Sequence, residues 1–387
     1  MSERTGPLAG LRMVEFAGIG PAPFGAMLMA DLGAEIIRID RPGGYPPPDP
    51  SLDFENMGAT AIFNRGRRTV RIDIKSDAGR AAVMRLVAGA DALIEGYRPG
   101  TMERLGFGPE ACLAANPHLV YARMTGWGQE GPLARSAGHD LNYIGVSGAL
   151  SLFGVGGDLM PGLPPLIGDM GGGGLFMAFG ILAAIIEARS SGKGQVVDAA
   201  IVDGAASLYA LVKGLHKAGV HPGPAGTNAL DGGRWFYRTY RCADGRHVAV
   251  GAIEPAFRRA LLKGLGLAAD PDFSGDTDDA HCTDQLMEIF ESRSRDEWSV
   301  LFEGTDACVT PVLSMDEAET SAHATARESF VTVAGVVQHA PSPRFSRTPG
   351  KVAVSAAEGS RDDPSALADW GLSDDELSAL RAAGAIS

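Results

Sequence analysis

A histidine and three carboxylates occupy positions in the sequence where they could move protons. His139 and Asp140 are neighbours in GHDLNY, ahead of a run of apolar and small residues. Asp169 lies between an apolar run and four glycines in PPLIGDMGGGG, and Glu254 directly follows the apolar run VGAI. A histidine and a carboxylate can each hold or release a proton near neutral pH once their surroundings adjust their pKa values. These residue types therefore predict acid–base chemistry.

Each acid also has a structural explanation. Asp169 and Asp140 both stand where a helix is expected to begin, and aspartate is a preferred N-cap residue. Glu254 is followed by Pro255, a common first residue of a helix. Taken one at a time, the acids leave the structural and the functional interpretation open.

Composition and motifs disfavour several other functions. The formal net charge of −13 over 387 residues repels phosphate backbones, so no nucleic-acid partner is expected. The chain has neither GxxxxGK[ST] nor HExxH, and GVSGA around Ser147 lacks the second glycine of a nucleophile elbow. GWGQEG at 126–131 fits GxGxxG, but Pro132 follows and no helix is expected there, which argues against a dinucleotide site. Neither a metal site nor a cofactor is predicted.

The cysteines and the apolar runs indicate a cytoplasmic protein. The four cysteines are scattered without a CxxC pair, which argues against a disulfide framework and a zinc site and suits a reducing compartment. The start MSERTGPLAG has no apolar signal-like run. The run MGGGGLFMAFGILAAII contains five glycines and is a little short for a membrane span, so we expect a core helix and no membrane insertion.

Strand-like and helix-like runs alternate through the first third of the chain. This alternation predicts βαβ units and a mostly parallel sheet covered on both faces. The strand-like runs are 11–16, 35–40, 68–74, 91–97 and 118–126. Ligands of such sheets bind beyond the carboxyl ends of the strands. The residues at those ends are Asp40 and Arg41, Ile74 and Lys75, Tyr97 and Arg98, and Thr125 and Gly126. Three of the four ends carry a basic residue, which could hold an anionic ligand.

The rest of the chain predicts a second, smaller domain. Two long helices are expected at about 172–189 and 197–217, followed by the Pro/Gly-rich stretch 219–233. Beyond it, WFYRTYR and RHVAVGAI flank CADG as a hairpin, helices are expected around 255–265 and 284–303, and a last helix is capped at Ser373. We therefore expect a large α/β domain (1–205 and 335–387), a linker helix and loop (206–233), and a small α+β domain with its return linker (234–334).

Long blocks of the sequence resemble the alpha-methylacyl-CoA racemases of the class III CoA-transferase superfamily. The blocks are LAGLRMVEFAGIGPAPFGAMLMADLGAEIIRIDRPG, NRGRRTVRIDI, YARMTGWGQEGPLARSAGHDLNYIGVSGAL, GDMGGGGLFMAFGILAAI, GKGQVVDA, CADGRHVAVGAIEPAF and PRFSRTPG. The resemblance implies a large Rossmann-like domain joined by long linkers to a smaller one. It also implies an interlocked homodimer whose active site lies at the subunit interface.

The same resemblance assigns roles to residues. It implies that His139 and Asp169 are catalytic and that Glu254 supports them, and we expect Glu254 to orient His139 by a hydrogen bond. It further implies that CoA, as part of the substrate, contacts Arg41, Arg71, Ile72, Asp73, Ile74, Gly138, Asp140, Leu141, Asn142 and Tyr143. Tyr97 and Arg98 join this set because they follow the expected strand 91–97.

Within the superfamily the sequence favours an isomerase. The transferases use the aspartate at the position of Asp169 as a nucleophile and generally lack the histidine, whereas GHDLNY keeps it and differs from the racemase pattern GHDINY only at Leu141. Inversion next to a thioester passes through a planar enolate, so one proton-carrying group is needed on each face. We expect a racemase of 2-methylacyl-CoA thioesters. The alternatives are a CoA-transferase acting through an aspartyl-CoA anhydride and a non-catalytic CoA-binding protein.

Overall fold

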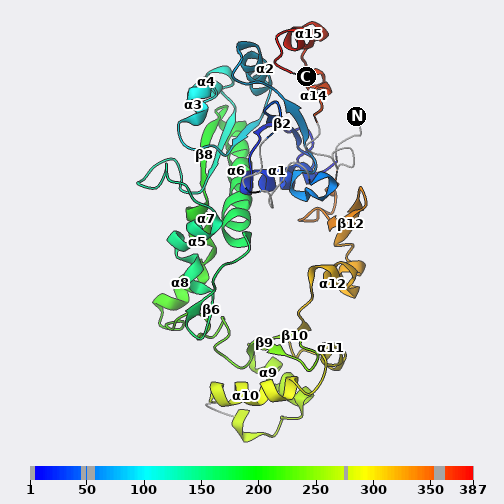
Figure 1. The fold of residues 1–387 in the computed structure, drawn as a ribbon. Coiled ribbons are helices and arrows are strands. Elements are labelled where there is room, and N and C mark those ends of the chain that lie inside the picture. The colour runs from blue at the N-terminus through cyan, green and yellow to red at the C-terminus, as the bar shows by residue number, and fades with distance from the viewer. Residues whose placement is uncertain (1–4, 45–48, 50–56, 274–277, 353–361, 387) are drawn as a thin grey trace. The chain divides into compact units, whose positions relative to one another are not determined.

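The chain forms two compact units in a computed structural model, which describes residues 5–44, 49, 57–273, 278–352 and 362–386 (Figure 1). The first unit comprises Met1–Ser147, Pro164–Leu208 and Ala322–Ser387, and the second comprises Gly148–Leu163 and Tyr209–Ser321. The second unit thus includes 148–163, a stretch that the sequence analysis placed in the large domain.

The first unit is built on a six-stranded sheet in which all neighbouring strands are parallel. Its strands are β1 (Arg12–Phe16), β2 (Glu35–Asp40), β3 (Arg68–Arg71), β4 (Ala92–Glu95), β5 (Val120–Thr125) and β8 (Gln195–Ala200). Their order is β3-β2-β1-β4-β5-β8, so the direction of winding reverses between β1 and β4. The expected α/β class with a large parallel sheet is confirmed. Ligands of such sheets bind outside the carboxyl ends of the strands at this reversal.

Helices cover both faces of the sheet because neighbouring strand residues point to opposite sides. In β1, Val14 packs into one buried cluster and Met13 into the other. The helical elements of this unit are η1 (Gly58–Thr60), η2 (Ile62–Asn64), α1 (Pro21–Asp31), α2 (Asp77–Ala88), α3 (Thr101–Leu105), α4 (Pro109–Ala115), α5 (Asp140–Ser147), η4 (Leu166–Leu175), α6 (Phe176–Ser191), α7 (Ile201–Leu208), α13 (Ala322–Ala326), α14 (Ser365–Asp369) and α15 (Asp374–Ala382). A hairpin, β12 (Phe330–Val333) with β13 (Val336–His339), completes it.

The second unit has its own core around a small antiparallel sheet, in the order β11-β10-β9. The strands are β9 (Tyr237–Arg241), β10 (His247–Gly251) and β11 (Val309–Pro311), and a short hairpin pairs β6 (Gly154–Val155) with β7 (Asp158–Leu159). The helices are η3 (Ala149–Leu152), α8 (Ala210–Lys217), α9 (Pro255–Leu265), η5 (Pro271–Phe273), α10 (Asp279–Phe290), α11 (Arg295–Phe302) and α12 (Met315–Thr320). The predicted hairpin around CADG is confirmed by the antiparallel pairing of β9 with β10.

Two of the expected helices were wrong. The first, 197–217, begins as strand β8, whose six residues all pair with β5, and becomes helical only at Ile201. Pairing with the sheet, together with the β-branched Val196 and Val197, outweighs the helical pattern there. The second, 284–303, is divided between α10 and α11, because Ser294 starts a new helix with a capping box to Glu297.

The apolar run expected as a core helix is continuous from Leu166 to Ser191. By length and composition it could cross a membrane, with a mean hydropathy of 1.7 over its most apolar window, of which 44% is buried. Its buried side chains, Met177, Ile181 and Ile185, belong to the same core cluster as Met13 of β1. This side of the helix is therefore part of the core of the first unit.

Candidate active site

The four glycines after Asp169 bring its segment into backbone contact with two other helices. Asp169 lies in the first turn of η4, a π-helical segment that continues into α6. A Cβ on Gly172 would stand 2.5 Å from the amide nitrogen of Ala205 in α7, and one on Gly174 would stand 2.5 Å from the carbonyl oxygen of Pro21 in α1. Only glycine allows these approaches, so the glycine run fixes where Asp169 is held.

The carboxyl group of Asp169 is able to carry a proton at neutral pH. Burial raises its pKa to about 7, and the nearby charge of Asp140 adds to the rise. A carboxylate with its ordinary pKa would be ionised under these conditions. The side chain is half-buried and accepts no helix-capping bond, so the capping explanation does not account for it.

Asp140 connects the segment of His139 with that of Asp169. Asp140 is the first residue of α5 and is only 7% exposed. Its Oδ1 accepts a hydrogen bond from the backbone N–H of Asp169 at 2.6 Å, and the N–H of Gly168 also donates to its carboxylate. Burial raises the pKa of Asp140, and these two N–H groups lower it. The structural explanation of Asp140 as an N-cap is therefore not met, because its side chain bonds to η4 instead.

Aromatic packing holds the backbone that carries His139. His139 is exposed and directly precedes α5, and its N–H donates to Oδ1 of Asn142 at 3.1 Å. The hydroxyl of Tyr143 donates to the carbonyl of Gly138, and its ring packs edge-on against Trp127 with 4.8 Å between centroids. The ring occupies space that a side chain on Gly126 would need, which gives the first glycine of GWGQEG a packing role.

Glu254 belongs to the second unit. It stands at the N-cap position of α9, is exposed, and makes no capping hydrogen bond with its side chain. Pro255 is the first residue of α9, so the helix start expected at Glu254 and Pro255 is confirmed. The expected hydrogen bond between Glu254 and His139 stays a prediction.

Of the expected CoA-binding residues, Arg41 and Arg71 lie at the carboxyl end of the sheet, where β2 and β3 end side by side. Gly138 precedes α5, and Asp140 to Tyr143 lie in its first turn. Asp40, the residue before Arg41, pairs with Arg71 in the sheet register, so Arg41 and Arg71 lie at neighbouring strand ends. Arg41 is exposed and its Nε donates to the carbonyl of Gly44. The strand predicted to run to Ile74 ends at Arg71, because the following residues bond to the C-terminal segment: Asp73 donates its N–H to the carbonyl of Ala385. Further along the sheet, the Tyr97 hydroxyl donates to the carbonyl of Ala17.

A family model described as CoA-transferase family III matches residues 8–360. This chain belongs to CoA-transferase family III. It is 41% identical to alpha-methylacyl-CoA racemase of Mus musculus over 96% of this chain and 95% of that protein. It is also 41% identical to the racemase of Homo sapiens, over 88% of this chain and 87% of that protein. Among solved structures, a CaiB/BaiF family protein from Brucella suis matches with a TM-score of 0.77 at 25% identity, over 98% of this chain and 99% of that one.

A buried ion pair in this family III chain, beside the expected CoA contacts, was not predicted from the sequence. Glu95, the last residue of β4, is fully buried; it accepts the N–H of Tyr97 at 2.7 Å and Nε of Arg123 at 3.0 Å. Arg123 also donates to Glu103 at 2.9 Å. Burial raises the pKa of Glu95 to about 7, although the Tyr97 N–H and Arg123 lower it. A charged residue inside the apolar run ALIE was the available signal.

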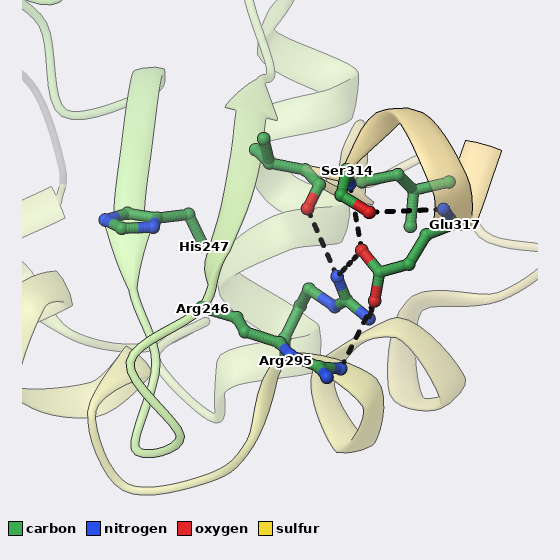
Figure 2. A pocket seen from close by; sticks show the side chains of 7 residues that line it. Arg246, His247, Arg295, Ser314 and Glu317 are labelled. Carbon is green, nitrogen blue, oxygen red and sulfur yellow. Dashed lines mark hydrogen bonds and ion pairs between the residues drawn. The ribbon is translucent and has the colours of Figure 1, made fainter.

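A cavity of about 500 Å³ lies in the second unit (Figure 2). Arg295 is 5% exposed and donates to both carboxylate oxygens of Glu317, at 2.8 and 2.9 Å. The exposed Arg246 approaches Glu317 from the other side at 3.4 Å. The charges that line this cavity pair with one another and tie α12 to α11.

Proposed function

We propose that this family III chain is an alpha-methylacyl-CoA racemase, an isomerase of 2-methylacyl-CoA thioesters. The two racemases to which it is similar along nearly its whole length support the activity. The observation that carries the chemistry is the connection between the two expected proton carriers: the residue next to His139 binds the backbone of Asp169, whose carboxyl group has a pKa near 7.

The proposed reaction moves a proton off one face of the substrate and onto the other. One group removes the α-hydrogen, which is acidified by the thioester carbonyl, and a planar enolate forms. The other group then donates a proton from the opposite face, so the enzyme ends each inversion with its proton on the other residue. Each of the two groups must therefore be present in both its protonated and its deprotonated form if the enzyme is to invert either configuration. A carboxyl group with a pKa near 7 meets this requirement when its partner is an imidazole.

The charge that develops on the thioester oxygen needs hydrogen-bond donors. The N-terminus of α5 directly follows His139 and supplies backbone N–H groups and the positive end of a helix dipole. The N–H of Asp169 is already occupied by Asp140, so we assign the donor role to α5 rather than to that amide.

For the substrate we propose that the phosphates of CoA lie near Arg41, Arg71 and Arg98. We also propose that Glu254 orients His139, that the active form is a homodimer, and that the protein acts in the cytoplasm without a further cofactor. The basic residues at the carboxyl ends of β2, β3 and β4 support the CoA assignment.

Exchange in D2O tests the function. With a 2-methylacyl-CoA ester of one configuration, the protein should incorporate deuterium at the α-carbon while it epimerises that centre. His139→Ala and Asp169→Ala should each lower this rate by about 100-fold or more. Transfer of CoA to an added free acid with the α-hydrogen retained would support the transferase instead. A thermal shift with CoA but neither exchange nor transfer would indicate a binding protein.

A further inference from the structure

We propose that Asp140 is a positioning residue for the reaction: its carboxylate holds Asp169 in place through the main chain and keeps a negative charge beside it. The inference rests on the proposed function and gives Asp140 a role other than the CoA contact expected from the sequence. The carboxylate is within hydrogen-bonding distance of the Asp169 backbone, at 2.6 Å from its nitrogen.

The geometry leaves Asp140 little freedom. The residue is 7% exposed, and a Cβ on Gly168 would overlap its Oδ1, so the missing side chain at position 168 makes room for the carboxylate. Its neighbour Ile144 on α5 is fully buried, which fixes the helix that carries Asp140. A movement of this helix would therefore move the Asp169 backbone with it, and His139 precedes the same helix.

The second oxygen of Asp140 distinguishes this contact from a simple structural bond. Oδ2 is buried and makes no hydrogen bond to any residue that the structure describes. A carboxyl group kept only for capping would commonly satisfy this oxygen or leave it in water. Here a buried negative charge stands beside a second carboxyl group, and like charges favour keeping the proton on one of them.

Few other charged groups face this pair. Tyr143, on the same helix, interacts electrostatically with both Asp140 and Asp169 and with Arg98. On α7, Asp203 is exposed, and on α1 the only titratable residue, Asp31, is paired with Arg65 at 2.6 Å. Within the described residues, Asp140 is thus the acid placed to influence how firmly Asp169 holds a proton.

The test uses Asp140→Asn and Asp140→Ala in the full-length protein. Asparagine keeps an oxygen that can accept the Asp169 N–H but removes the charge, whereas alanine removes both. Asp375→Asn, an exposed acid in the first turn of α15, is the matched control for losing a charge in the same unit. The readouts are kcat and KM for a 2-methylacyl-CoA ester across pH, and the melting temperature.

We expect Asp140→Asn to lower kcat by about tenfold with KM changed less than about twofold. Because the charge of Asp140 raises the pKa of Asp169, the limb of the pH profile that reports Asp169 should move to lower pH. Asp140→Ala should lower kcat further. A wild-type pH profile and kcat in Asp140→Asn, with only a lower melting temperature, would show a purely structural role and overturn the proposal. If Asp140→Ala does not fold, Asp140→Asn alone decides.

A readout that needs no turnover separates this inference from the proposed function. The protein is labelled with 13C at the aspartate carboxyl carbons and its NMR signals are followed across pH. The signal that is missing from the spectrum of Asp169→Asn belongs to Asp169. The titration of this signal is then compared between the wild type and Asp140→Asn. Suppose that Asp140→Asn moves the Asp169 titration to lower pH but the wild-type protein shows no α-hydrogen exchange. This result supports the inference about Asp140 and rejects the racemase. If Asp140→Asn leaves the titration unmoved and the wild-type protein does exchange the α-hydrogen, the racemase is supported and the inference about Asp140 is rejected.

Discussion

The carboxylate of Asp169 lies against Gly20, the N-cap residue of α1: a Cβ built on Gly20 would stand 3.0 Å from Oδ2. The backbone of Gly20 has φ of 72°, a conformation that favours glycine. The main chain of α1 therefore bounds one side of this acid. A larger residue there would move either the helix or the carboxylate.

Replacement of Gly20 by alanine should reduce kcat by about tenfold, because the Asp169 carboxylate would have to move by a few tenths of an ångström and a misplacement of about 1 Å costs about 100-fold. Gly371→Ala is the control: Gly371 also has a positive φ, of 94°, but a Cβ there meets no atom within 4 Å. Both variants should lose stability from backbone strain, and only Gly20→Ala should lose activity beyond that. Equal activity in the two would show that the contact with Asp169 has no catalytic consequence.

The raised pKa of Asp169 predicts how stability varies with pH. The folded protein keeps a proton on this carboxyl group up to about pH 7, whereas the unfolded chain releases it near its ordinary value of 3.8. The folded state therefore binds more protons between these values, and this group makes the protein less stable as the pH rises through that window. Asp169→Asn should remove this contribution and flatten the curve of urea midpoint against pH from 4 to 7. An unchanged curve would mean that Asp169 is ionised throughout.

Glu95→Gln should weaken substrate binding more than turnover. Glu95 fixes the N–H of Tyr97 and the guanidinium of Arg123, and Tyr97 and Arg98 are expected at the CoA site. We expect KM for the acyl-CoA to rise about three- to tenfold while kcat stays within about twofold. Glu110→Gln, an exposed acid in the first turn of α4, should change neither. A fall in kcat at constant KM would place Glu95 in the chemical step instead.

Glu317→Gln should destabilise the second unit without changing the chemistry. Arg295 holds the pKa of Glu317 down, at about 2, so the stability from this pair is present above the ordinary value of 4.5 and is lost as the pH falls through about 2. At neutral pH the variant removes one of the two carboxylates that bind the buried Arg295, since Asp296 still accepts from it at 2.8 and 2.9 Å, and the melting temperature should fall. The neighbouring exposed Asp316→Asn should melt like the wild type. Equal melting of the two variants would contradict a stabilising role for the pair.

Elements with strong local signals could be predicted from the sequence. Strand 35–40 and helix 255–265 match β2 and α9 at both ends, and the capping box at Ser373 starts α15 as expected. These signals are local: they are β-branched residues in the strand, a proline at the first helical position, and a serine followed three residues later by glutamate. Each favours its element through residues that are close in the sequence. The acids and the histidine could likewise be selected by their type and their place at the ends of apolar runs.

Features that depend on distant partners could not be predicted. Strand β8 exists because β5 lies beside it, and the bond from the Asp169 N–H to Asp140 joins residues 29 positions apart. No local pattern indicates which amide a carboxylate will accept. The buried pair of Glu95 and Arg123 is of the same kind, since only the sheet register brings the two residues together.

The path of the chain through the first unit has a consequence for how the protein is synthesised. Its core includes Val14 and Val70 from the beginning of the chain and Ala385 and Ile386 from its last turn. The core cluster of the second unit runs from Trp235 to Val309, and these residues leave the ribosome before Ala385 and Ile386. Because domains generally fold as units while the chain emerges, we expect the second unit to fold first. The sheet, whose edge is expected to bind CoA, would then complete its core only after Ala385 and Ile386 have emerged.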